Sequence, residues 1–248
     1  MPYQSLREIH DKLKLHKVFW GRFALAETRK RKGDKMNTMM AIVVVSTLAI
    51  TLLSAWLAVL LYLNYREKKN LSYVFWSAGL AFFAIGTLLE AIFAYGIYSQ
   101  ILAKLYLFVV ALLVVLLGEG SALSVKNKIV TYAFTTFAIV ASLFMLYALA
   151  VSTIGNIIVN YVVYGALPIY VVIASSVATF PAVVMIIAAA IMSYRHTRNA
   201  KMLSIIAGVI IVSIAGTLYI VQFPVLLYYA EAAGIALLWL GFYSRKHI

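Results

Sequence analysis

The sequence has no cysteine, and charged residues make up only 12% of its 248 positions. Without cysteine the chain can form no disulfide, no thiolate metal site and no cysteine nucleophile. The charge content is well below the roughly 25% that is usual in soluble domains. Hydrophobic residues, at 65%, fill long uninterrupted runs instead. We therefore expect an all-α polytopic membrane protein, because helices satisfy their own backbone hydrogen bonds in lipid while they stay apolar on every face.

Histidine is missing from every apolar run, since His10 and His16 lie near the start of the chain while His196 and His247 follow such runs. Haem ligation by two buried histidines is thereby excluded. The sequence also lacks a recognised metal-ligand spacing, a glycine-rich phosphate loop, a nucleophile elbow and an HExxH motif. The last apolar run has no lysine before Lys246, which excludes a retinal Schiff base there. We expect no cofactor, no metal and no enzymatic activity.

The apolar runs are long enough to cross a hydrocarbon core of about 30 Å, which takes roughly 20 helical residues. Seven such spans are predicted, at residues 40–63, 71–97, 101–124, 129–151, 161–193, 202–222 and 225–244. The fifth is longer than a bilayer needs and holds Pro168 and Pro181. We expect it to be tilted, kinked or preceded by an interfacial piece around residues 155–164. It is predicted to cross once, because no polar turn divides it.

The first 35 residues form a separate basic segment ahead of a seven-helix transmembrane domain, residues 36–248. They contain ten of the 21 lysines and arginines. Residues 4–25 carry apolar side chains at helical spacing among these cations, namely Leu6, Ile9, Leu13, Trp20 and Phe23. This pattern predicts a basic amphipathic helix suited to a membrane surface, followed by a solvated linker. The positive charge therefore favours membrane lipids as partners and not nucleic acid.

The connections between spans indicate the orientation. Cations follow spans one, three, five and seven, whereas the connections at the other ends carry none. The positive-inside rule then predicts a multi-pass protein of the cell membrane with a cytoplasmic C-terminus and a first span that starts outside. The basic N-terminal segment opposes this orientation. Two explanations stay open: the native start is Met36 and the basic segment is an extension, or the segment folds onto the outer surface or a partner protein.

Three ionisable residues are predicted to lie inside the outer half of the bundle. Glu90 and Glu231 are placed about 10 Å deep, at 1.5 Å per residue, and Lys104 lies across a helical hairpin from Glu90. An ion pair between Glu90 and Lys104, with Glu231 as a third member, would hold these charges in lipid. Hydrogen bonds from tyrosines are the alternative. Either arrangement would fix helix register, or the cluster would form a proton or cation site that opens outward.

Glu119 lies near the cytoplasmic end of span three in the sequence Gly118-Glu119-Gly120-Ser121. The small neighbours predict close approach of another helix. A hydrogen bond from Glu119 to that helix, by way of a serine or tyrosine, is one interpretation. A role in proton relay is the other, although no chain of polar residues bridges the middle of the bundle.

Several short motifs extend across spans two to seven. They are Trp76-Ser77-Ala78-Gly79-Leu80, Glu90-Ala91, Leu105-Tyr106, Leu117-Gly118-Glu119-Gly120, Phe223-Pro224 with Tyr228, and Gly241-Phe242. In these motifs the chain resembles seven-span prokaryotic membrane proteins of uncharacterised function. The resemblance implies the fold and the orientation, and it assigns no role to any residue.

Two functions stay open at this point. The first is a non-enzymatic membrane protein that acts through contacts, as a subunit of a larger membrane complex or as a receptor-like module. The second is a small secondary transporter or proton-linked carrier that uses the buried glutamates. A carrier needs a water-accessible cavity that reaches Glu90 or Glu119, which the structure can test.

Overall fold

The computed structural model describes residues 40–159, 162–163, 167–198, 203–208, 210–211 and 224–243. Residues 43–248 belong to one compact unit, which the description below concerns. The predicted N-terminal segment, residues 1–35, and its amphipathic helix lie outside the described residues.

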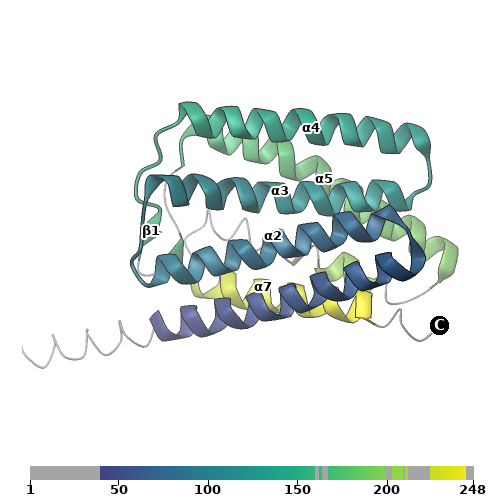
Figure 1. Cartoon of the computed structure of the whole chain (residues 1–248), viewed down its shortest axis with the longest axis horizontal. Helices are drawn as coiled ribbons and strands as arrows, with labels where there is room; N and C mark the ends of the chain where they lie inside the picture. Colours follow the sequence, from purple (N-terminus) through teal and green to yellow (C-terminus); the bar gives the residue numbers. More distant parts are fainter. Residues whose placement is uncertain are drawn as a thin grey trace, which may run out of the picture. The chain divides into compact units, whose positions relative to one another are not determined.

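The described part of the chain is almost entirely helical (Figure 1). Its helices are a first helix, Met40–Lys68, and then α2, Leu71–Ala94; α3, Gln100–Ser124; α4, Lys128–Val151; α5, Ile169–Thr197; and α7, Pro224–Tyr243. Among the described residues, five helices are long and apolar enough to cross a membrane, from the first helix to α5. They lie where the first five spans were predicted.

The last two predicted spans are described only in part. Residues 203–208 and 210–211 are helical and fall within the sixth span. Helix α7 covers nearly the whole seventh span and is apolar over Tyr229–Gly241. The structure thus supports a helical membrane protein, and the total of seven spans stays a prediction.

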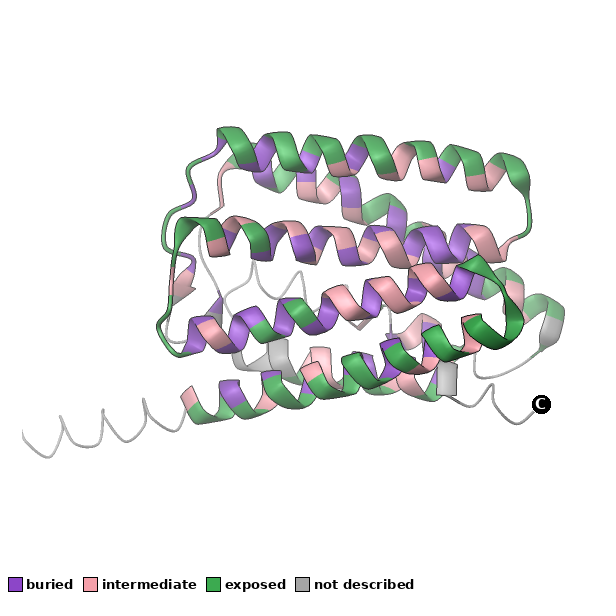
Figure 2. Cartoon of the chain, in the orientation of Figure 1, coloured by how far each residue is buried: buried purple, intermediate pink, exposed green. Residues whose placement is uncertain are grey.

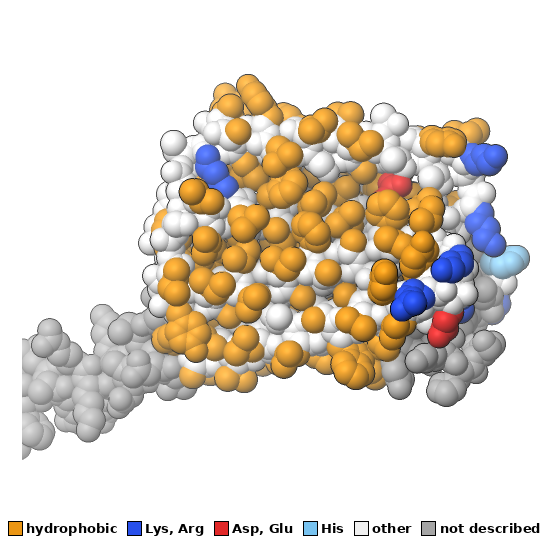
Figure 3. All heavy atoms as spheres, viewed as in Figure 1, with side chains coloured by type: hydrophobic (Ala, Val, Ile, Leu, Met, Phe, Trp, Pro, Cys, Tyr) orange, Lys and Arg blue, Asp and Glu red, His pale blue; other side chains and the backbone are white. Residues whose placement is uncertain are grey.

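Two of the tight turns between helices are built alike. Lys69 and Lys126 each take a left-handed backbone conformation, with φ of 52° and 59°. The next residue, Asn70 or Asn127, then caps the following helix by accepting a backbone N–H in its first turn. These turns share one end of the bundle with the C-terminal end of α5, which we call the basic end (Figure 3). Its described lysines and arginines are Arg66, Lys68, Lys69, Lys126, Lys128, Arg195 and Arg198.

The fifth predicted span corresponds to a hairpin followed by a helix. Strand β1, Ile158–Val159, pairs with β2, Val162–Val163, in antiparallel register. Helix α5 begins only at Ile169, after Pro168 as its N-terminal cap, so the predicted start at residue 161 is wrong. The reason is that a proline disfavours helical conformation in the residue before it. A separate piece, the hairpin, precedes the helix, and its place at the membrane interface stays a prediction; α5 is one helix with Pro181 inside it.

Tyr98 connects the turn between α2 and α3 to the loop between α4 and β1. Its hydroxyl donates to the backbone carbonyls of Ile154 and Gly155. Burial raises the pKa of Tyr98 above its ordinary value of 10.0, because the charged phenolate is less well solvated there. At the end of the bundle opposite the basic end, the Tyr98 phenol thus ties the turn between α2 and α3 to the loop that follows α4.

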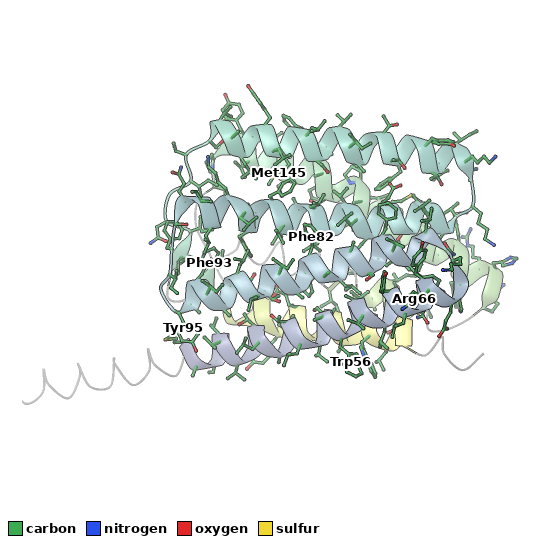
Figure 4. All side chains as sticks on the ribbon, in the orientation of Figure 1. Trp56, Arg66, Phe82, Phe93, Tyr95 and Met145 are labelled. Carbon is green, nitrogen blue, oxygen red and sulfur yellow. The ribbon has the colours of Figure 1, made fainter. Side chains whose placement is uncertain are left out.

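Helix α3 packs against α2, α4 and α5. Buried residues occur along nearly the whole length of α3, whereas α4 is exposed along much of its length (Figure 2). Phe93 and Met145, which extend from α2 and α4 toward α3, are at most 1% exposed (Figure 4). Trp56, on the first helix, is 63% exposed. An apolar surface of this kind suits helices that face lipid.

Candidate functional site

Glu90 is buried between helices and is held by a tyrosine. The residue is 3% exposed, and its Oε1 atom accepts a hydrogen bond of 2.6 Å from the Tyr106 hydroxyl on α3. Tyr106 is itself fixed by an edge-on ring contact with Phe93, at 5.7 Å between ring centroids. The predicted alternative of a tyrosine hydrogen bond is therefore confirmed for Glu90.

Lys104 does not form the predicted ion pair with Glu90. Its Nζ atom is exposed and lies 3.5 Å from the carbonyl oxygen of Ala150, at the end of α4. The reason is the period of the helix: residues two apart point about 200° from each other, so Lys104 and Tyr106 cannot both face α2. Tyr106 takes the face toward Glu90, and Lys104 turns toward α4.

Glu231, on α7, interacts with Glu90 but not as the third member of the predicted ion pair, since Lys104 lies elsewhere. Its carboxyl group lies close enough for the two charges to interact, and like charges at short range repel. Within the described residues, the Oε2 atoms of both Glu90 and Glu231 are buried and have no hydrogen-bond partner. We call Glu90, Tyr106 and Glu231 the acidic cluster, which joins α2, α3 and α7.

Glu119 is separate from the acidic cluster and binds α4. It is 5% exposed, and its Oε1 atom lies 2.5 Å from the hydroxyl of Thr135. That hydroxyl also lies 2.9 Å from the carbonyl oxygen of Thr131. The predicted hydrogen bond between helices is confirmed, with a threonine in place of a serine or tyrosine. The short bond fixes α3 against α4.

Glycines on either side of Glu119 let two helices approach α3. A Cβ atom on Gly118 would lie 2.7 Å from the Phe134 ring of α4. One on Gly120 would lie 2.5 Å from the Trp76 ring and 2.9 Å from the carbonyl oxygen of Ser72, both on α2. The predicted close approach of another helix is thus confirmed, and it occurs on both faces of α3.

Residues 203–208 and α7 also pack closely through small residues. Ser204 donates a hydrogen bond of 2.7 Å to the carbonyl oxygen of Leu237. A Cβ atom on Gly208 would lie 2.9 Å from the carbonyl oxygen of Gly234. The small residues therefore serve contact within the chain.

A cavity of about 780 Å³ opens at the basic end. It lies among the start of α2, the ends of α3 and α5, and residues of the last two predicted spans. The basic residues of its described lining are Lys126, Arg195 and His196. Aromatic and apolar side chains, among them Tyr73 and Trp76, form much of the rest. We call it the basic cavity.

Within the described part of the chain, the basic cavity does not reach the predicted site residues. Glu90, Lys104, Glu119 and Glu231 are all absent from its described lining. Its volume lies within the range of about 300–1,000 Å³ that is usual for small-molecule sites. The structure thus separates an enclosed acidic cluster from an open basic cavity.

Sequence reasoning missed this cavity. It treated Lys126, Arg195 and His196 only as signals of orientation or span ends, because they follow apolar runs far apart in the sequence. One signal of the cavity was present in the sequence: Trp76 and Ser121 have side chains that can form hydrogen bonds, although they lie within apolar spans. The structure joins them, with the Trp76 Nε1 atom donating to the Ser121 hydroxyl at 3.3 Å.

Comparisons with known proteins find no matching family model, no matching curated protein and no matching solved structure. The resemblance to seven-span prokaryotic membrane proteins therefore transfers no residue role to this chain. Function has to be argued from the acidic cluster and the basic cavity themselves.

Proposed function

We propose that the protein is a non-enzymatic, receptor-like module of the membrane that binds a ligand in the basic cavity. One observation carries this proposal: a cavity of ligand size, about 780 Å³, opens at the basic end and leaves the buried glutamates outside its described lining. A carrier would need a cavity that reaches Glu90 or Glu119. Under the positive-inside assignment the basic end faces the cytoplasm, so the ligand would be taken from that side.

The wall of the cavity suits a receptor because several helices contribute to it. Trp76 comes from α2, Ser121 from α3 and Arg195 from α5. A ligand that contacts all three helices stabilises one arrangement of them over others. The same helices are available to contact a membrane partner through their exposed apolar faces, so signalling to another subunit is compatible with this role.

The proposal is tested by native mass spectrometry of the full chain after gentle extraction from its own membrane. We expect a reproducible small-molecule mass on the chain, and loss of that mass in Ser124→Phe, which fills the cavity from its wall. The matched control is Thr136→Phe, on the exposed face of α4, which should retain the mass. An unliganded wild-type chain with a stoichiometric protein partner would replace the receptor role by that of a complex subunit.

A proton-linked carrier is the second candidate, and the acidic cluster favours it. Two buried carboxyl groups, Glu90 and Glu231, interact and each has an oxygen without a described partner. Such a pair can take up and release a proton. The test is acidification of the lumen of proteoliposomes, reported by a trapped pH-sensitive dye. Proton flux that is lost in both Glu90→Gln and Glu231→Gln would support the carrier, whereas equal dye traces with and without the protein would exclude it.

A further inference from the structure

The charge of the basic cavity is of one sign. Lys126 follows α3, and Arg195 and His196 lie in the last turn of α5, so cations approach from two elements. Among the described residues that line the cavity there is no aspartate or glutamate. Cations gathered around a hollow without an acid favour an anionic ligand group.

The chemistry of these cations favours phosphate among anions. Arginine presents a planar fork of donors that fits phosphate oxygens, and lysine adds a mobile point charge. The serines of the wall add no free donors, because the hydroxyls of Ser121 and Ser124 already donate to the carbonyl oxygens of Leu117 and Ser121. A phosphate group offers more acceptor oxygens than a carboxylate and can therefore bind Lys126 and Arg195 together.

The rest of the wall indicates that the ligand is larger than phosphate alone. Leu80, Leu117, Ile186, Ile205 and Leu238 line the cavity together with the ring of Trp76. Leu80 is 1% exposed and belongs to the apolar core of the bundle, so this part of the wall lies toward the interior. The ligand thus needs an apolar body beside its charged group.

Resting on the function proposed above, we infer that the basic cavity binds an amphiphile that has a phosphate group and a net negative charge. Lys126 and Arg195 hold the phosphate at the mouth, His196 lies beside it, and the apolar body lies along Trp76 and Leu117. Two sources supply such a molecule: an anionic phospholipid of the adjoining leaflet, or a phosphorylated compound from the aqueous side. Basic pockets between helices at this level of a bundle are suited to lipid headgroups.

The test uses the full chain in nanodiscs of phosphatidylcholine. Dihexanoyl phosphatidic acid is titrated in, with dihexanoyl phosphatidylcholine as a ligand of equal apolar size and no net charge. Geranyl phosphate provides a phosphorylated amphiphile that is not a phospholipid, and inorganic phosphate provides the head alone. Binding is measured by tryptophan fluorescence, with Trp76→Phe to identify the response of the cavity, and by the melting temperature.

We expect the two amphiphiles of net negative charge, dihexanoyl phosphatidic acid and geranyl phosphate, to bind and the other two probes to leave both signals unchanged. The double variant Lys126→Gln/Arg195→Gln should lower the affinity by about tenfold or more, the effect of losing charge-assisted hydrogen bonds. The matched control Lys68→Gln/Lys128→Gln removes two cations of the basic end that do not line the cavity and should bind as the wild type. Stronger binding of phosphatidic acid indicates a lipid source, and stronger binding of geranyl phosphate indicates an aqueous one.

Other outcomes overturn the proposal in distinguishable ways. Equal binding of dihexanoyl phosphatidylcholine would refute the role of the anion while the receptor-like function stands. Equal binding of inorganic phosphate would refute the apolar body. If no probe binds and Ser124→Phe changes no mass on the natively extracted chain, the phosphate inference and the receptor function both fail.

Discussion

The acidic cluster and the basic cavity differ in how they hold charge-bearing groups. In the cluster, Glu90 is 3% exposed and is bound by a hydrogen bond from Tyr106. In the cavity, Lys126, Arg195 and His196 are exposed around an open volume. Ionisable residues deep in a bundle are costly and need a partner from the protein, whereas those at its end keep contact with water. The first arrangement fastens helices, and the second leaves its donors available to a ligand.

The largest effect is expected where α2 and α3 pack closely beside the basic cavity. Gly120→Leu would place side-chain atoms where the Trp76 ring and the Ser72 carbonyl already lie. We expect a loss of about 3 kcal/mol in the free energy of unfolding, the upper range for overpacking. Unfolding by sodium dodecyl sulfate titration, followed by circular dichroism, measures it.

Gly155→Ala is the control for that substitution, because a Cβ atom there meets nothing within 4 Å. It should unfold as the wild type. If Gly120→Leu were equally neutral, the close approach of α2 to α3 beside the cavity would be refuted.

The enclosed region is tested by removing the hydroxyl that binds Glu90. Tyr106→Phe keeps the ring against Phe93 and leaves the buried Oε1 atom without that donor. We expect a loss of about 2 kcal/mol, typical of a hydrogen bond to a charged or buried group. Tyr147→Phe, on α4 and 65% exposed, should change the free energy of unfolding by much less. Equal effects of both substitutions would show that the phenol of Tyr106 has no special part in the cluster.

Lys104 offers a further test of this comparison. It is ionisable and was predicted to lie across the hairpin from Glu90, yet it belongs to neither the acidic cluster nor the basic cavity. Its Nζ atom, which is exposed, lies 3.5 Å from the carbonyl oxygen of Ala150. We expect Lys104→Met to change the free energy of unfolding by less than about 0.5 kcal/mol, as for an exposed charge. If Lys104→Met lowered the free energy of unfolding as much as Tyr106→Phe, that result would support an ion pair between Lys104 and Glu90 after all.

The smallest effect is expected when a rise in pH ionises Tyr98, which lies at the end of the bundle opposite the basic cavity. The pKa of Tyr98 is raised by burial, so the folded chain favours the neutral phenol that donates to Gly155. Its contribution to stability is complete below its ordinary value of 10.0 and is lost as pH rises above that value toward the raised one. The melting temperature should therefore fall less steeply above pH 10 in Tyr98→Phe than in the wild type. If the melting temperatures of both proteins fell in parallel above pH 10, the ionisation of Tyr98 would have no part in the loss of stability.

Helix positions were predictable because apolar run length and short polar connections determine them locally. The first five helices begin within two residues of their predicted starts, except for α5, where Pro168 postpones the helix to Ile169. The sixth and seventh spans and the orientation in the membrane stay predictions.

The candidate site was predictable in part. Burial of Glu90, Glu119 and Glu231 follows from their places inside apolar runs, and the meeting of Glu90 with Glu231 was predicted. The partner of Glu90 was not, because depth alone does not say which face of α3 turns toward α2. The basic cavity could not be predicted either, since Lys126 and Arg195 are 69 positions apart and only packing brings them together.

Pro181 gives α5 a mechanical property. Proline lacks the N–H that would bond the carbonyl of residue 177, so the helix is most easily bent there. From Pro181 to Arg195 the helix is about 21 Å long, at 1.5 Å per residue. A bend of about 10° at the proline would then move the arginine by about 4 Å, more than the length of a hydrogen bond. A modest bend at Pro181 would therefore be enough to move Arg195 toward or away from a ligand at the mouth of the basic cavity.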